Sequence, residues 1–214
     1  MPKVYKVSKS RKPHTCGRCG RIINVGEGYY YAEPRYGPKV VRCLSHYPRP
    51  SELTTSEKLS ILYGVEEEIR DIAFDPSGYS LDSLKDKLEE VISTLEELAP
   101  QVTTVGEEYY QSADNQEEYF PGSPTIDEIR EKADNCEAFA SSIESAISDL
   151  KELLEELSYL EEPLPPKVDG FSSKQEYLDA QLEYECELSE LESQVDEIAS
   201  EAESVISTLE SEIP

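Results

Sequence analysis

Hydrophobic residues recur along most of this chain at alternating steps of three and four, a spacing that places them on one face of an α-helix. The first long run begins near residue 80 and continues through Pro100, where a proline predicts a kink in the helix rather than its end. Its apolar positions are Leu81, Leu84, Leu88, Val91, Leu95, Leu98, Val102, Val105 and Tyr109. This pattern predicts a helix over residues 80–118.

Two further runs keep the same spacing. The capping-box sequence that begins at Thr125 predicts a helix over residues 125–161, and the one that begins at Ser173 predicts a helix over residues 172–212. Short proline-rich breaks separate the three helices, which have closely matched lengths. These features predict an up-down-up bundle. An extended coiled coil that dimerises is the alternative, and the heptad pattern is compatible with both.

The first fifty residues follow a different pattern. Two short β-strands are predicted over residues 27–33 and 39–42, because they are rich in tyrosine and valine and a Pro-Arg-Tyr-Gly-Pro turn separates them. A capping-box sequence at Thr54 then predicts a short connecting helix. The fold class is therefore mainly α, with a small N-terminal β-hairpin module followed by a long antiparallel three-helix bundle or coiled coil. The predicted domains are a basic arm at 1–13, the hairpin module at 14–50, the connecting helix at 54–74 and an acidic helical bundle at 80–213.

Charge divides the chain in the same way. Residues 1–50 contain 11 Lys or Arg and two acids, a net charge of +9, which leaves −35 for the other 164 residues of a chain whose total is −26. The first 13 residues alone carry Lys3, Lys6, Lys9, Arg11 and Lys12. They have almost nothing to bury, so we expect them to form a mobile arm. Such asymmetry predicts two modules with different partners.

The hairpin module carries two pairs of metal-ligating residues. Cys16 and Cys19 form a Cys-x-x-Cys pair, and Cys43 and His46 form a second pair after 23 intervening residues. Three thiols and one imidazole at this spacing predict a closed Cys3His site for one structural Zn²⁺ per chain. A redox Cys-x-x-Cys pair is disfavoured because no βαβ pattern surrounds it. His14 remains an alternative to His46 as the fourth ligand.

The same observations argue against catalysis. Four protein ligands leave a zinc ion no open position for water, and no serine or cysteine motif lies beside a histidine. The many glutamates follow the solvated faces of the helices. No long apolar run or signal sequence is found, and the odd number of cysteines fits a reducing compartment. We therefore expect a non-enzymatic cytoplasmic protein with no membrane partner and no small-molecule substrate.

Two functions are compatible with this composition. In the first, the basic module contacts nucleic acid, with cations for the phosphates and tyrosines, Tyr36 among them, on which bases stack. The candidate contacts are Arg18, Arg21, Tyr30, Arg35, Lys39, Arg42 and Arg49. In the second, the protein is a structural component or adaptor whose acidic helices bind partner proteins. Some of the tyrosines are also expected to form a small core behind the metal.

The order of motifs in residues 11–57 carries a resemblance. Cys-Gly-Arg-Cys-Gly is followed by Gly-Glu-x-Tyr, Arg-Tyr-Gly-Pro-Lys-Val-Val-Arg-Cys and Arg-Pro-Ser-Glu-Leu-Thr-Thr-Ser, and then by an acidic helical body. This order resembles a family of uncharacterised zinc-finger proteins of tailed bacteriophages and related mobile elements. That family usually has two cysteines in the second ligand pair, where this chain has Cys43 and His46. The resemblance implies a phage or prophage origin and a bacterial host cytoplasm, and it implies no activity.

Overall fold

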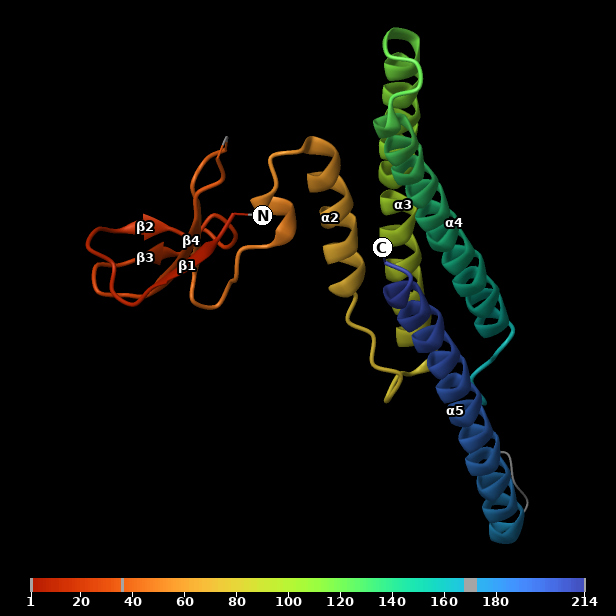
Figure 1. Cartoon of the computed structure of the whole chain (residues 1–214). Coiled ribbons are helices and arrows are strands. Elements are labelled where there is room, and N and C mark those ends of the chain that lie inside the picture. Colours follow the sequence, from red (N-terminus) through yellow and green to blue (C-terminus); the bar gives the residue numbers. More distant parts are fainter. Residues whose placement is uncertain (1, 36, 168–172, 214) are drawn as a thin grey trace. The chain divides into compact units, whose positions relative to one another are not determined.

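The computed structural model describes residues 2–35, 37–167 and 173–213, and its fold is mainly α with a small N-terminal β region (Figure 1). Met1 of the predicted arm, Tyr36, and residues 168–172 of the predicted bundle lie outside the described residues. The helices are α1 (Pro50–Leu53), α2 (Glu57–Arg70), α3 (Leu81–Tyr119), α4 (Pro124–Ser158) and α5 (Lys174–Ser211). The strands are β1 (Val4–Val7), β2 (His14–Thr15), β3 (Ile22–Ile23), β4 (Tyr29–Ala32) and β5 (Val40–Cys43).

The predicted hairpin is confirmed, and the sheet gains a third strand from the arm. β4 and β5 pair antiparallel, and β1 pairs antiparallel with the other edge of β4. The mobile arm expected from the sequence is thus in part a strand. The sequence predicts that the arm has almost nothing to bury, but Val4 packs against an apolar cluster formed by Ala32, Val40 and Leu53.

A second, two-stranded sheet lies beside the metal-ligand pairs. β2 and β3 pair antiparallel, with His14 opposite Ile23 and Thr15 opposite Ile22. Ile23 is buried together with Tyr29 in a cluster that also contains Cys16 and Cys43. Among its described residues the N-terminal module therefore has two small apolar cores, and one of them includes two of the predicted metal ligands.

Within the range 54–74 predicted for the connecting helix lies α2, and a separate single turn, α1, precedes that range. Pro50 occupies the first turn of α1, where its missing N–H costs nothing, and Thr54 ends this single turn in an extended conformation. Ser56 then caps α2, because its side chain accepts a hydrogen bond from the Leu59 N–H. The apolar side chains of Val65 and Ile69 are buried along one side of α2.

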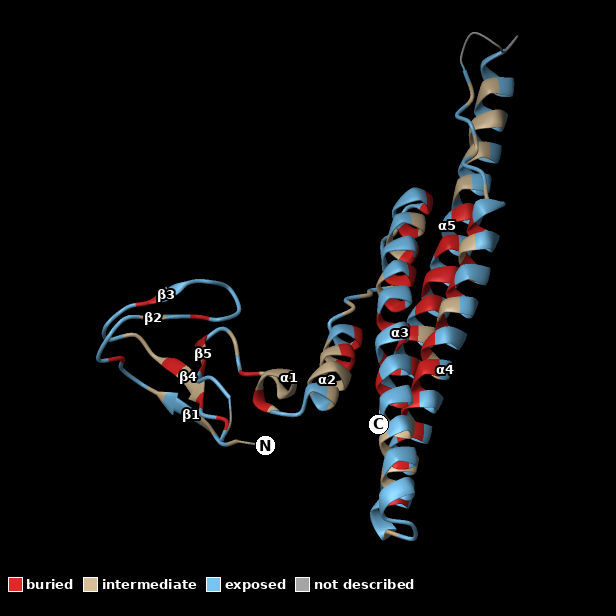
Figure 2. Cartoon of the chain, turned by 90° about the horizontal axis from the view of Figure 1, so that it is seen from above, coloured by how far each residue is buried: buried red, intermediate tan, exposed pale blue. Residues whose placement is uncertain are grey.

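The three long helices have nearly the predicted bounds, and α3 continues through Pro100. The chain forms two compact units, Met1–Asp71 with Gln101–Cys136 and Ile72–Pro100 with Glu137–Pro214. α3 and α4 contribute to both units, whereas α5 belongs to the second alone. Figure 2 shows buried residues along one side of each long helix. None of the helices in the described ranges combines the length and apolar content that a membrane span requires.

The apolar seam of α5 is buried over only part of its length. Its buried positions begin at Leu191 and continue to Leu209, whereas Tyr184 and Leu188, earlier on the same seam, are half-buried. The first half of α5 is therefore less buried than the second half. Heptad spacing fixes which face of a helix is apolar, but it does not specify how much of that face a neighbour covers.

Candidate metal centre and basic surface

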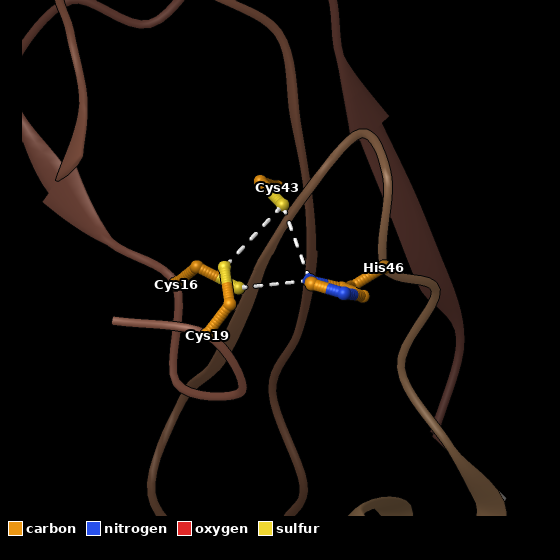
Figure 3. Close-up of side chains that lie close together, drawn as sticks. All are labelled: Cys16, Cys19, Cys43 and His46. Carbon is orange, nitrogen blue, oxygen red and sulfur yellow. Dashed lines mark hydrogen bonds between the residues drawn. The ribbon is translucent and has the colours of Figure 1, made fainter. Parts of the chain in front are cut away.

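The four predicted ligands come together at one point of the N-terminal module (Figure 3). Cys16 follows β2, Cys19 lies in the turn between β2 and β3, Cys43 ends β5, and His46 lies in the loop after it. One ligand atom from each residue lies within 4.8 Å of all the others. Cys16, Cys19, Cys43 and His46 can therefore hold a single metal ion.

The backbone of the Cys-x-x-Cys turn is closed by its own hydrogen bonds. The Gly20 N–H donates to the Cys16 carbonyl at 2.9 Å, and the Cys16 N–H donates to the Arg21 carbonyl at 2.9 Å. Gly20 has a φ of 68°, in the left-handed region that glycine enters without a steric penalty. This turn allows Cys16 and Cys19, which are three positions apart in the sequence, to contribute to the same candidate metal site.

Three of the distances between ligand atoms are close to those around a tetrahedral ion. His46 Nδ1 lies 3.3 Å from Cys43 Sγ and 3.7 Å from Cys16 Sγ, and the Cys19 and Cys43 sulfurs are 4.0 Å apart. A tetrahedral zinc ion with bonds of about 2.3 Å to sulfur and 2.0–2.1 Å to nitrogen separates its ligand atoms by roughly 3.5–3.8 Å. All three cysteines are free thiols rather than disulfide partners.

The surroundings of Cys16 favour its thiolate form, which is the form that binds metals. Burial raises the pKa of this thiol, but backbone N–H groups of Cys19, Cys43 and Arg18 and the side chain of His46 outweigh burial and lower it to about 5. For Cys19 the balance is opposite. A hydrogen bond from the Arg21 backbone lowers its pKa, while desolvation and the neighbouring sulfurs of Cys16 and Cys43 give a net rise. A bound cation would relieve this crowding of sulfurs.

The structure distinguishes between the two histidines. His14 pairs with Ile23 in the two-stranded sheet, and its ring lies against Tyr29 with the ring centres 4.7 Å apart. His46 is the histidine whose ring nitrogen lies among the three sulfurs. The candidate ligand set is therefore Cys3His with His46, and His14 belongs to the aromatic packing beside it.

This chain matches no protein-family model, no curated protein and no solved structure. The inferences about function therefore depend on the site itself.

Arg42, predicted as a phosphate contact, supports the metal turn from inside. It is only 8% exposed, and its Nε lies 3.1 Å from both carboxylate oxygens of Glu52. A Cβ added at Gly17 would meet the Arg42 guanidinium at 2.2 Å, so a glycine makes room for it. The prediction for Arg42 is corrected on this ground, because a buried guanidinium held by a carboxylate is not available to a phosphate.

Four other predicted cations also have carboxylate partners. Lys39 lies 2.8 Å from Glu33, and Arg21 lies 3.2 Å from Glu27. Arg18 and Arg49 both contact Asp71, the first at 3.6 Å. Arg35 is exposed and lines a surface pocket. Much of the positive charge predicted for the hairpin is thus offset by its own neighbours.

The tyrosines form two groups on opposite faces of the sheet. Tyr31 stacks with Tyr5 of β1, with ring centres 5.2 Å apart and planes inclined by 21°. On the other face the ring of Tyr30 meets Tyr47 edge-on at 5.2 Å, and the Lys6 ammonium lies 5.8 Å from the Tyr30 ring centre. Tyr29 is buried in the small core behind the metal site together with Ile23, and Tyr31 packs against this core.

The arm contributes cations that the residue-level predictions did not include. Lys3, Lys6, Lys9, Arg11 and Lys12 are exposed, and within the described residues none of them forms an ion pair with a carboxylate. Ser10, between them, is 3% exposed, and its backbone is bonded to Glu27 and Gly26. Lys6 on β1 and Lys9 and Arg11 beside Ser10 are thus held on hydrogen-bonded backbone. The sequence does carry a signal for these contacts, because residues 1–13 contain five cations and no Asp or Glu.

Proposed function

We propose that this chain is a non-enzymatic zinc protein whose N-terminal module binds nucleic acid through its basic arm. The observation that carries the proposal is the set of five arm cations, which have no carboxylate partner among the described residues. Neutralising phosphates releases their condensed counterions, and this release supplies most of the affinity in binding that is independent of base sequence.

Zinc is the proposed metal because of the donor set. Thiolates and imidazole in a tetrahedral arrangement favour zinc over the hard cations, which prefer oxygen ligands. Cys16, Cys19, Cys43 and His46 would hold it as a closed structural site, and this closure is the reason to propose no hydrolytic activity. The ion would brace the turn and loop that flank the sheet.

Order in the arm supports the nucleic-acid proposal. Lys6 lies on β1, and Lys9 and Arg11 flank Ser10, whose backbone carbonyl accepts from Gly26 and whose N–H donates to Glu27 at 2.7 Å. Cations on ordered backbone lose less conformational entropy on binding than cations on a free tail. Tyr5, which is 45% exposed, adds a ring on which a base can stack.

An adaptor role is the second candidate, and a different observation favours it. The ion pairs Lys39–Glu33, Arg21–Glu27 and Arg42–Glu52 show the hairpin using much of its charge internally. In that role the acidic helices would bind a partner protein in the cytoplasm of a bacterial host. Capture of partners from that host with and without nuclease separates the candidates, because a nucleic-acid bridge is lost on digestion.

The direct test is binding of labelled oligonucleotides to the zinc-loaded full chain at low salt. A variant with Lys6, Lys9 and Lys12 replaced by Ala should bind single and double strands more weakly, and the slope of log K against log salt should flatten by about 2–3. Its matched control replaces Lys132, Lys167 and Lys174 by Ala, which changes the net charge equally on the acidic body. Equal weakening in both variants, or no binding by the parent, would overturn the proposal.

A further inference from the structure

A surface pocket adjoins the basic arm in the N-terminal unit. Its volume is about 710 Å³, within the range of about 300–1,000 Å³ that is usual for small-molecule sites. Strand β1, the loop after β4, and helices α1 and α2 supply its walls. The lining residues that matter for its chemistry are Lys3, Tyr5, Arg35, Thr55, Leu59 and Tyr63.

The walls combine an apolar floor with excess positive charge. Leu53 is buried and Leu59 is 37% exposed, and both line the pocket. Glu33 is an acid in the lining, but Lys39 lies 2.8 Å from its carboxylate and offsets its charge. Lys3 and Arg35 therefore give the pocket a positive balance, which favours an anionic ligand.

A stacked aromatic pair borders this pocket. Tyr5 is part of the lining, and its ring stacks on Tyr31. The Lys3 ammonium lies 5.5 Å from the Tyr5 ring centre, and the Lys39 ammonium lies 3.9 Å from that of Tyr31. A flat, electron-rich ligand can stack on such an aromatic ring and place its negative group beside the neighbouring cations.

We propose that this pocket binds one nucleotide, with the base against Tyr5 and the phosphate near Lys3 and Arg35. A nucleotide has the required planar ring and an anionic group for the cations. Its sugar can form hydrogen bonds with the hydroxyls of Thr55 and Tyr63. The inference rests on the proposed function and deepens it, because a nucleic-acid strand bound along the arm would place one of its nucleotides in this pocket. It predicts a preference for single strands, whose bases are free to leave the stack.

Calorimetric titration of the zinc-loaded full chain with adenosine 5′-monophosphate tests the pocket apart from the arm. Thr55→Trp adds a large ring to the lining and should weaken nucleotide binding tenfold or more, which corresponds to about 1.4 kcal/mol or more. Ser93→Trp, an exposed position on α3, is the control for an added ring and should leave the affinity unchanged. The Lys6, Lys9 and Lys12 variant should also bind the nucleotide normally.

The outcomes separate the two proposals. If strands bind but the nucleotide does not at millimolar concentration, the pocket inference falls and the nucleic-acid proposal stands. If the nucleotide binds and strands do not, the reverse holds. Unchanged binding by Thr55→Trp would also overturn the inference. So would inorganic phosphate competing as well as the nucleotide, because the base would then contribute nothing.

Discussion

The hairpin module and the helical body are stabilised by different interactions. The module has two small clusters, of which the larger is Cys16, Ile23, Tyr29 and Cys43 with partly buried neighbours. The body buries long seams of leucine, isoleucine and valine along α3, α4 and α5. A segment of about 50 residues rarely stabilises itself by apolar burial alone, so a metal is the expected supplement. The helices need no such ion.

Removing the metal should have the largest effect. It should unfold the hairpin module and leave the helical body folded. Binding of a structural zinc ion supplies about 10–16 kcal/mol, which is more than the module's small cores can replace. Chelation or Cys43→Ser should therefore unfold residues 14–50 while helical circular dichroism stays nearly constant. Hydrogen exchange of the module amides is the direct measurement.

The control for this experiment is Cys186→Ser, which changes an exposed cysteine of α5 outside the ligand set. Metal analysis of the parent and of this control should both give one zinc per chain. Zinc well below one per chain after metal-replete expression, or loss of helicity on chelation, would contradict the division between the regions.

The corresponding change in the body is Leu150→Asp. Leu150 is fully buried in the α4 seam, so a carboxylate there loses its hydration without gaining a partner and should destabilise the helices by several kcal/mol, roughly 4 or more. Glu152→Gln, at an exposed position two residues along the same helix, should change stability little. Urea denaturation followed by helical circular dichroism measures both, and similar midpoints for the two variants would refute the predicted seam.

The same contrast explains what could be predicted from the sequence. The spacing of Cys16, Cys19, Cys43 and His46 identified the cluster because metal ligands impose fixed local spacings. Heptad spacing identified the long helices for a similar reason. Burial of Arg42 was not predictable, since it depends on Glu52, ten residues away in the sequence, and on the space at Gly17. Addition of β1 to the sheet is a nonlocal pairing that no local pattern specifies.

Breaking the Arg42–Glu52 pair tests a link within the module. The Arg42 side chain is 10% exposed and the Glu52 side chain 22% exposed, so removing one partner leaves a poorly solvated charge. Arg42→Ala should destabilise the module by about 3–5 kcal/mol. Arg21→Ala, at a more exposed ion pair, should cost about 1 kcal/mol or less.

Thermal unfolding of the zinc-loaded variants, followed by the tyrosine signal, measures this difference. A double change of Arg42 and Glu52 to Met and Leu should recover part of the loss, because it removes both charges together. Equal effects of Arg42→Ala and Arg21→Ala would show that the buried pair does not support the metal turn.

The smallest expected effect comes from the first half of α5, and it separates the bundle from the alternative coiled-coil dimer. Leu182 is 62% exposed, so Leu182→Asp should change the stability of a monomer by only about 0.5 kcal/mol, whereas Val195→Asp on the buried part of the same helix should cost several times more. In a dimer whose interface includes the exposed side of this part of α5, Leu182 would be covered by a second chain. Light scattering across a concentration series would then show a dimer that Leu182→Asp dissociates, and the intramolecular bundle would be the wrong description.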